Sequence, residues 1–279
     1  MLTTLASTRD IQRLYPDCCI LDCRFSLADP AQGAEQYKEG HIPGAHYTHL
    51  DSDLSGEIDF GRSGRHPLPD RESFAKTLRG WGIHNRTQVI AYDDSGGPFA
   101  ARLWWMMKWI GHEAVAVLDG GLAAWKRDGG DLDSLVPPQG SGKITVRAPI
   151  AKLVSASDVL NNSGWLLLDA REGARFRGDA EPLDPVAGRI PGAINAPFQQ
   201  NLSDQGQFHK PQAITSRYAS LLGNKSIEDV VCYCGSGVTA AHNVLAMQHA
   251  GLGTPKLYAG SWSEWITDPE RPIERGPAA

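Results

Sequence analysis

The chain of 279 residues contains an internal repeat, and this repeat limits the folds that it can adopt. The segment Leu21–Arg24 returns as Leu168–Arg171, and the motif Gly-His-Ile-Pro-Gly-Ala at residues 40–45 returns as Gly-Arg-Ile-Pro-Gly-Ala at residues 188–193. Two further pairs of segments correspond, Tyr92–Gly96 with Tyr233–Gly237 and Gly120–Trp125 with Ala259–Trp265. Because four segments recur in one order at a nearly constant offset, the sequence predicts two copies of one domain.

Within each copy, short apolar runs alternate with helical patterns. The runs are Cys18–Asp22, Gln88–Tyr92 and Ala114–Leu118 in the first copy, and Trp165–Asp169, Val230–Tyr233 and Lys256–Tyr258 in the second. The clearest helical patterns are Glu72–Trp81, Arg102–Ile110 and Ala240–His249. This alternation predicts an α/β fold, with a mostly parallel sheet and helices on both faces in each copy.

The boundary between the copies is expected in a stretch rich in proline and glycine. Residues 137–142 read Pro-Pro-Gln-Gly-Ser-Gly, a composition typical of a connecting segment. We therefore expect a first domain over residues 1–135, a linker over residues 136–150 and a second domain over residues 151–279.

The composition, 41% hydrophobic and 21% charged, is that of a soluble globular protein. A net charge of −5 speaks against nucleic acid or an anionic membrane as the main partner. We see neither a secretory signal nor an apolar stretch long enough to span a membrane. The five cysteines lack the spacing of a metal site or a disulfide framework, so we expect a cytoplasmic protein without metal or other cofactor.

One cysteine stands where a nucleophile would be placed. Cys234 ends an apolar run and opens the loop Cys-Gly-Ser-Gly-Val-Thr, after which a helical pattern begins. Backbone N–H groups and the helix dipole would favour a thiolate there, and Gly235 and Gly237 would let the loop curl by adopting positive φ. The other interpretation is a buried structural cysteine. The first copy has Asp93 at this position, so only the second copy can perform thiol chemistry.

The two-copy layout, the Gly-His-Ile-Pro-Gly-Ala motif and the cysteine loop together resemble the two-domain rhodanese-like sulfurtransferases, over essentially the whole chain. The loop is most similar to that of the 3-mercaptopyruvate sulfurtransferases, whereas relatives that use thiosulfate usually have basic residues just after the cysteine. The resemblance implies two tandem rhodanese-like domains, of which only the second is catalytic. It also implies transfer of a sulfane sulfur from 3-mercaptopyruvate to cyanide or a thiol, such as that of a thioredoxin-like protein, through a persulfide on Cys234.

The resemblance also implies roles for residues outside the nucleophile. Ser236 would relay a proton, and Asp51 and His66 from the first domain would complete this relay. A hydroxyl backed by a base suits the chemistry, because the pyruvate enolate that leaves needs a proton. The loop residues, Gly235, Gly237, Val238 and Thr239, would line the substrate site. Without the resemblance, Asp51 and His66 read equally well as turn residues.

A donor that carries a carboxylate calls for arginines. Arg175 matches the family arginine that holds this carboxylate by forked hydrogen bonds. A second family arginine, some nine residues on, is absent, because the chain has Leu183 after Glu-Pro. Arg189 or Arg177 would be the replacement. This departure leaves the donor more open than the reaction type.

Four other functions are considered for the cysteine loop. A phosphatase of the Cys-X5-Arg type is unsupported, because the position of its arginine is Ala240, and a P-loop is excluded by the absence of Gly-Lys-Ser/Thr. The alternatives that stay open are a thiosulfate:cyanide sulfurtransferase and a non-catalytic carrier of sulfane sulfur. Whether Cys232, two residues before the nucleophile, has a redox role is also open.

Overall fold

A computed structural model describes residues 1–277, which form two compact units. The first unit comprises residues 1–56, 69–150 and 204–208, and the second comprises residues 57–68, 151–203 and the described residues from 209 onward. The segment 57–68 therefore groups with the second unit although it lies in the first half of the chain. The expected linker, residues 136–150, groups with the first unit, where backbone hydrogen bonds tie Gly140 to Gly80 and Ile144 to Ile83.

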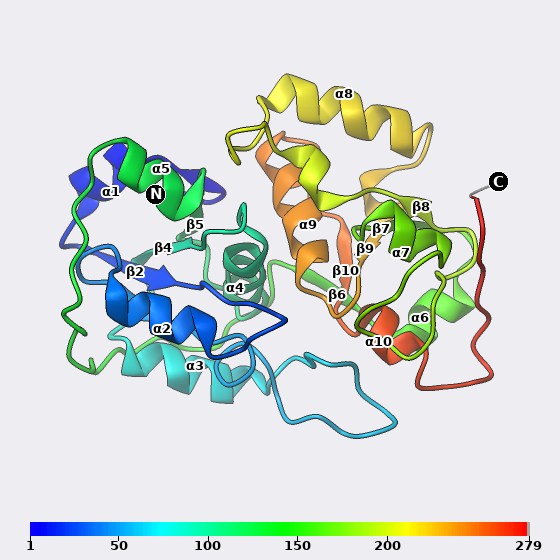
Figure 1. Cartoon of the computed structure of the whole chain (residues 1–279), viewed down its shortest axis with the longest axis horizontal. Coiled ribbons are helices and arrows are strands. Elements are labelled where there is room, and N and C mark those ends of the chain that lie inside the picture. The colour runs from blue at the N-terminus through cyan, green and yellow to red at the C-terminus, as the bar shows by residue number, and fades with distance from the viewer. Residues whose placement is uncertain (278–279) are drawn as a thin grey trace. The chain divides into compact units, whose positions relative to one another are not determined.

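The first unit contains a five-stranded parallel sheet in the order β1-β5-β4-β2-β3 (Figure 1). Its strands are β1 (Leu5–Ala6), β2 (Cys18–Asp22), β3 (His46–Tyr47), β4 (Gln88–Tyr92) and β5 (Val115–Leu118). Its helices are α1 (Thr8–Leu14), α2 (Gln32–Glu39), α3 (Arg71–Gly80), α4 (Pro98–Trp109) and α5 (Gly121–Arg127). In the longest pairing, Cys18–Asp22 lies in register with Gln88–Tyr92.

The second unit has the same topology, with all neighbouring strands parallel and the order β6-β10-β9-β7-β8. Its strands are β6 (Lys152–Val154), β7 (Leu166–Asp169), β8 (Ile194–Asn195), β9 (Val230–Tyr233) and β10 (Lys256–Tyr258). Its helices are α6 (Ala156–Asn161), α7 (Gly173–Arg177), α8 (Pro211–Leu222), α9 (Thr239–His249) and α10 (Ser261–Trp265), with 3-10 turns at Phe198–Asn201 and Ile227–Asp229. The repeated sequence thus produces a repeated fold.

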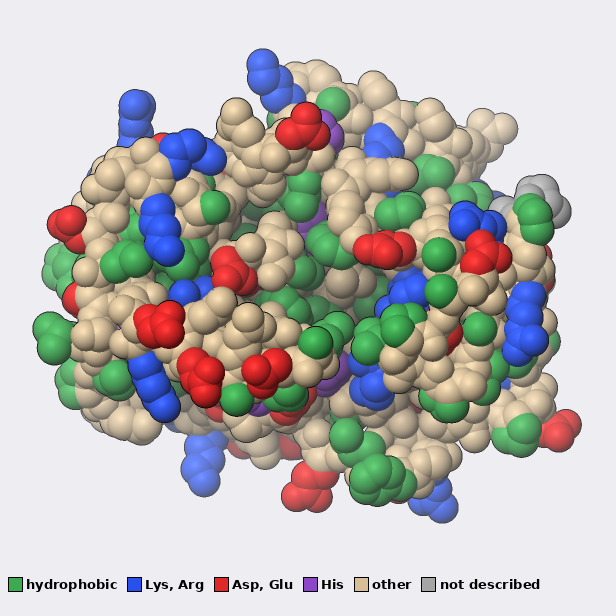
Figure 2. All heavy atoms as spheres, viewed as in Figure 1, with side chains coloured by type: hydrophobic (Ala, Val, Ile, Leu, Met, Phe, Trp, Pro, Cys, Tyr) green, Lys and Arg blue, Asp and Glu red, His purple; other side chains and the backbone are tan. Residues whose placement is uncertain are grey.

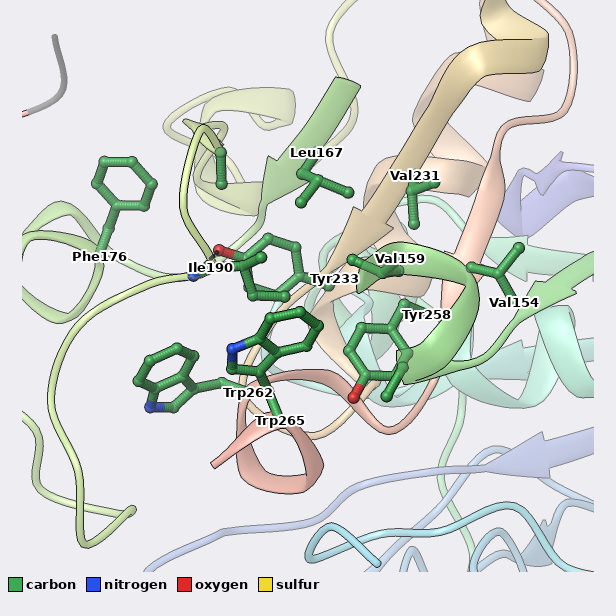
Figure 3. Packing of buried hydrophobic residues seen from close by; sticks show 12 residues of the cluster. Val154, Val159, Leu167, Phe176, Ile190, Val231, Tyr233, Tyr258, Trp262 and Trp265 are labelled. Atoms are coloured by element: carbon green, nitrogen blue, oxygen red, sulfur yellow. Dashed lines mark hydrogen bonds between the residues drawn. The ribbon is translucent and has the colours of Figure 1, made fainter. Parts of the chain in front are cut away.

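Helices pack against both faces of each sheet and bury the apolar side chains of its strands. In the second unit, residues of α6, α7 and α10 share one cluster with alternate residues of β9, while α9 packs on β9 and β10 and carries α8. Figure 3 shows the aromatic part of this cluster, in which Tyr233, Tyr258, Trp262 and Trp265 lie together. The two tryptophans are at most 2% exposed, so they are core residues. In the first unit, α1 and α5 cover the corresponding face.

The α/β class and the parallel sheets are confirmed, and four of the six expected strands have the expected bounds. The strands that the sequence did not indicate are β1, β3, β6 and β8, which have two or three residues each and carry too little periodicity to be seen.

Within residues 1–277 no helix is long and apolar enough to cross a bilayer. On the face seen in Figure 2, basic and acidic side chains are interspersed.

Candidate functional site

Cys234 directly follows β9, at the carboxyl end of the second sheet, where ligands of parallel α/β folds gather. Its side chain is almost fully buried. Its backbone is held from both sides by α10: the Cys234 N–H donates to Ser261 Oγ (3.0 Å), and the Cys234 carbonyl accepts from Trp262 N–H (3.0 Å). Ser261 has φ = +57°, a strained value for a residue with a side chain, and its Oγ also donates to the Tyr258 carbonyl. The nucleophile position is therefore rigid.

The loop after Cys234 turns the amide of Gly237 toward the sulfur. Gly237 donates its N–H to Cys234 Sγ (3.2 Å) and has φ = +78°, and a Cβ there would lie 2.1 Å from the Ala259 carbonyl oxygen. Only glycine fits this position. Helix α9 starts at Thr239, close to Cys234 in the chain. Its N-cap residue Val238 has no side-chain hydrogen bond to the first turn of the helix.

Gly235 corrects one expectation, because it does not have positive φ. It is small for a different reason. A Cβ on Gly235 would lie 3.0 Å from Arg65 Nη2 and 3.3–3.4 Å from Arg175 Nη2 and Nη1. Two guanidinium groups thus converge on the backbone of the residue next to Cys234, and a side chain at Gly235 would crowd them.

Ser236 and His66 come together within the second unit. His66 Nδ1 lies 2.7 Å from Ser236 Oγ, and both side chains are nearly buried. His66 lies in the segment 57–68, which groups with the second unit although it belongs to the first half of the chain. A hydroxyl in contact with an imidazole, two residues from the sulfur, can move a proton at that place.

Asp51 belongs to the first unit, directly after Leu50 in the turn that follows β3. Its backbone N–H donates to His49 Nδ1 (3.1 Å).

In the described part of the chain, no three His, Cys, Asp or Glu side chains are grouped so that they could hold a metal ion.

Arg175, on α7, is held by two acidic residues. Its Nε and Nη2 donate to the carboxylate of Glu181 at 2.7–3.1 Å, and Nη2 also donates to Asp184 Oδ2 (3.1 Å). Burial raises the pKa of Glu181, but the hydrogen bonds and charge of Arg175 lower it further, so that it ends below its ordinary value. Glu181 and Asp184 thus hold the guanidinium of Arg175 near Gly235 of the cysteine loop.

Arg65 was not expected in the site. Its Nε and Nη2 donate to the two carboxylate oxygens of Asp184 at 2.9 and 3.3 Å, in the second unit. Asp184, whose side chain is 1% exposed, therefore bridges Arg65 and Arg175. The sequence signals were the positions of these residues beside expected ones: Arg65 precedes His66, and Asp184 follows Leu183.

Arg189 and Arg177, the expected replacements for the missing arginine, are used elsewhere. The guanidinium of Arg189 is buried, pairs with Glu274 and donates to the carbonyls of Gly276 and Pro277. It ties the C-terminal segment to the sheet and has no partner in the cysteine loop among the described residues, so we withdraw it as a substrate ligand. Arg177 pairs with the exposed Asp179 at 2.7 Å.

Comparison with known proteins places the chain in a family. The model of the rhodanese-like domain matches residues 7–128 and 154–268. A probable 3-mercaptopyruvate sulfurtransferase of Pseudomonas aeruginosa is 48% identical over 94% of this chain and 93% of its own length. A putative thiosulfate sulfurtransferase of Mycobacterium tuberculosis is 42% identical over 100% of this chain and 98% of its own length.

Solved structures agree with this placement. The 3-mercaptopyruvate sulfurtransferase of Leishmania major superposes with a TM-score of 0.83 at 29% identity, over 94% of this chain and 74% of that chain. That of Escherichia coli superposes with a TM-score of 0.79 at 30% identity, over 94% of this chain and 100% of that chain. With two matched domains, relatives along its whole length and a cysteine in one of two equivalent loops, the chain belongs to the rhodanese-like sulfurtransferases.

Proposed function

We propose that this sulfurtransferase takes sulfur from 3-mercaptopyruvate and passes it to a thiol or to cyanide through a persulfide on Cys234. The observation that carries the proposal is the arrangement around one sulfur atom. An amide N–H contacts Cys234 Sγ, the hydroxyl–imidazole pair of Ser236 and His66 lies two residues on, and two guanidinium groups converge on Gly235. A nucleophile, a proton relay and a carboxylate-binding group thus surround one loop.

The first half-reaction follows from these groups. The Cys234 thiolate attacks the sulfur of 3-mercaptopyruvate, and a sulfur–sulfur bond forms as the carbon–sulfur bond breaks. The electron pair of the broken bond passes to the carbon fragment, which leaves as the enolate of pyruvate. The enolate takes up one proton at carbon and becomes pyruvate, and Cys234 is left as a persulfide.

The proton that this step requires is supplied by the relay. His66 Nδ1 is close enough to Ser236 Oγ to exchange a proton with it, and the hydroxyl can hand its own proton to the enolate. The family pattern adds a carboxylate to this relay, and Asp51 is the residue that matches it. We include Asp51 on that pattern, and the variant Asp51→Asn tests it by a fall in kcat.

In the second half-reaction, an acceptor thiolate attacks the outer sulfur of the persulfide. The acceptor gains that sulfur, and Cys234 returns as the thiolate, so the enzyme needs no cofactor. A thioredoxin-like dithiol suits this step because it would release the sulfur as sulfide by forming its own disulfide. The five cysteines, all free, fit the reducing cytoplasm in which such acceptors work.

The test is kcat/KM for 3-mercaptopyruvate and for thiosulfate, measured side by side with Cys234→Ser as the control. We expect a preference for 3-mercaptopyruvate, and a loss of about 10³-fold or more in the variant, with its fold intact by circular dichroism. Turnover retained by Cys234→Ser would disprove the mechanism. Failure of both donors, together with a single stoichiometric loading of Cys234 by a persulfide donor, would favour the carrier function.

Thiosulfate is the second candidate donor, for two reasons. The Mycobacterium tuberculosis relative carries that printed name, and the guanidinium groups of Arg65 and Arg175 bring to the loop positive charge that its own sequence lacks. A dianion could use both. A thiosulfate preference in the same assay would move the assignment to this branch.

A further inference from the structure

The absence of an arginine at Leu183 leaves the second unit one cation short of the family pattern, and the structure offers another cation at the same loop. Arg65 Nη2 would lie 3.0 Å from a Cβ on Gly235, closer than either terminal nitrogen of Arg175, at 3.3 and 3.4 Å. Leu183 is 38% exposed, and its side chain has no group that binds an anion. The charge missing from one position is thus available from another element.

The backbone of Arg65 is fastened to the cysteine loop. Arg65 N–H donates to Ser263 Oγ (3.1 Å), and Ser263 N–H donates to the carbonyl of Gly235 (2.8 Å). Gly64 packs so closely that a Cβ on it would lie 2.5 Å from Ser263 Oγ. With His66 on Ser236, three consecutive residues of this segment are therefore tied to the loop or to the helix that supports it.

The side chain of Arg65 is positioned as firmly. Asp184 accepts from Arg65 Nε and Nη2 through both oxygens, and a bidentate pair with a buried carboxylate fixes the plane of the guanidinium. Among the described residues, the Nη1 groups of Arg65 and Arg175 take no part in these bonds. The Arg65 side chain is 28% exposed, so it is accessible to a small ligand from solvent.

We propose that Arg65 is the second carboxylate-binding residue of this enzyme and that it replaces the arginine absent at Leu183. It forms with Arg175 a two-guanidinium clamp, bridged by Asp184, which holds the carboxylate of a short α-keto thiol while Cys234 attacks the sulfur. The clamp also explains why residue 235 is glycine. This inference rests on the proposed function, because the carboxylate belongs to the donor proposed there.

The experiment compares Arg65→Ala with wild type on two donors, 3-mercaptopyruvate and 1-mercapto-2-propanone, which has the same ketone and thiol but no carboxylate. We expect KM for 3-mercaptopyruvate to rise about 10- to 100-fold and kcat to change less, because one charged hydrogen-bonding partner is lost. With the neutral donor the variant should match wild type. Arg65→Lys, which keeps the charge, should restore part of the loss.

The matched control is Arg62→Ala, which removes an exposed arginine three residues earlier in the same segment. It should behave as wild type with both donors. An equal loss with both donors in Arg65→Ala would show that Arg65 only supports the fold of the site, and an unchanged KM for 3-mercaptopyruvate would show that it does not touch the carboxylate. Either result overturns the proposal.

A second readout needs no turnover and so separates this proposal from the proposed function. Pyruvate bound in the clamp should protect Cys234 from alkylation by iodoacetamide in wild type, and at least about 10-fold more pyruvate should be needed in Arg65→Ala. If wild type fails to use 3-mercaptopyruvate, the proposed function fails, and this measurement still decides on Arg65. Equal protection in both proteins would overturn the clamp.

Discussion

The two units have equivalent loops at the same position in their two sheets, but the side chains in these loops differ. In the first unit Asp93 follows β4, and in the second Cys234 follows β9. In both, the residue's carbonyl accepts an N–H from the helix after the last strand, Leu122 N–H on Asp93 and Trp262 N–H on Cys234, each at 3.0 Å. The backbone frame is therefore shared, and the side chains decide what each loop does.

The carboxylate of Asp93 satisfies its own loop. Its two oxygens accept N–H groups from Ser95, Gly97, Phe99 and Ala100 at 2.8–3.0 Å, in full burial. An internal anion thus occupies the ring of amides in the first unit. Cys234 Sγ instead receives a hydrogen bond from the Gly237 N–H, and its side chain does not fill the loop with an internal anion.

The neighbouring positions differ in the same direction. Asp94 of the first unit corresponds to Gly235 of the second. The first unit therefore has a side chain at the position on which, in the second unit, two guanidinium groups converge. Gly121, with φ = +55°, corresponds to Ser261, with φ = +57°, whose hydroxyl holds the Cys234 amide. The comparison teaches that the loop fold can hold an anion on its amides, as it does with Asp93, and that the proposed activity depends on the sulfur and the groups brought to it.

Replacing the nucleophile by the residue of the other unit gives the largest effect. In Cys234→Asp we expect sulfur transfer to fall by about 10³-fold or more, because a carboxylate cannot carry a persulfide. We expect the variant to fold, because loop amides can donate hydrogen bonds to the new carboxylate as they do to Asp93. The measurement is turnover of 3-mercaptopyruvate together with thermal unfolding. Residual turnover near the wild-type rate would mean that another cysteine carries the sulfur.

Removing the expected carboxylate ligand should affect binding more than folding. Arg175→Ala should raise KM for 3-mercaptopyruvate about 10- to 100-fold. Arg177→Ala, on the same helix but paired with exposed Asp179, is the control and should leave KM unchanged. The assignment of Arg175 to the substrate site does not survive if both variants give the wild-type KM.

The buried aspartate of the first loop makes stability depend on pH. Burial raises the pKa of Asp93 to about 6, against the amide hydrogen bonds from Ala100, Ser95 and Gly97. The folded state therefore binds the proton more tightly than the unfolded chain, so this contribution to stability is complete below about pH 4 and is lost as the pH rises through 6.

The corresponding measurement is denaturant unfolding of wild type and Asp93→Asn between pH 4 and pH 7. Relative to the variant, wild type should lose up to about 3 kcal/mol of unfolding free energy over this interval, from a shift of about two pKa units. A difference between the two proteins that stays constant with pH would show that Asp93 keeps its ordinary pKa.

The smallest effect is expected at Cys232, which lies in β9 two residues before the nucleophile. Its side chain is fully buried, and burial raises the pKa of its thiol. It should stay a thiol, so Cys232→Ala should change kcat/KM less than about twofold. Brief treatment with iodoacetamide should label Cys234 but not Cys232, as read by mass spectrometry; a labelled Cys232 would reopen its redox role.

The sequence alone was sufficient for the fold and for selecting the cysteine that we propose as the nucleophile. The repeat requires two equal domains, and the apolar runs of four or five residues lie at the strands because buried parallel strands need them. The loop at Cys234 was visible because small residues at fixed spacing are required for a tight turn before a helix. The short edge strands escaped notice, since two residues give no period.

Only the tertiary structure decided which charged residues gather at the cysteine loop. Arg65 lies more than a hundred residues before Arg175 and Asp184, and no local pattern relates it to them, yet the three form one bridged cluster. Arg189 belongs to the repeated Gly-Arg-Ile-Pro-Gly-Ala motif, but its guanidinium binds the C-terminal segment through Glu274 and the Gly276 carbonyl. A guanidinium can reach several places from its own backbone position, so the carboxylates that fold around it, and not its neighbours in sequence, determine where its charge acts.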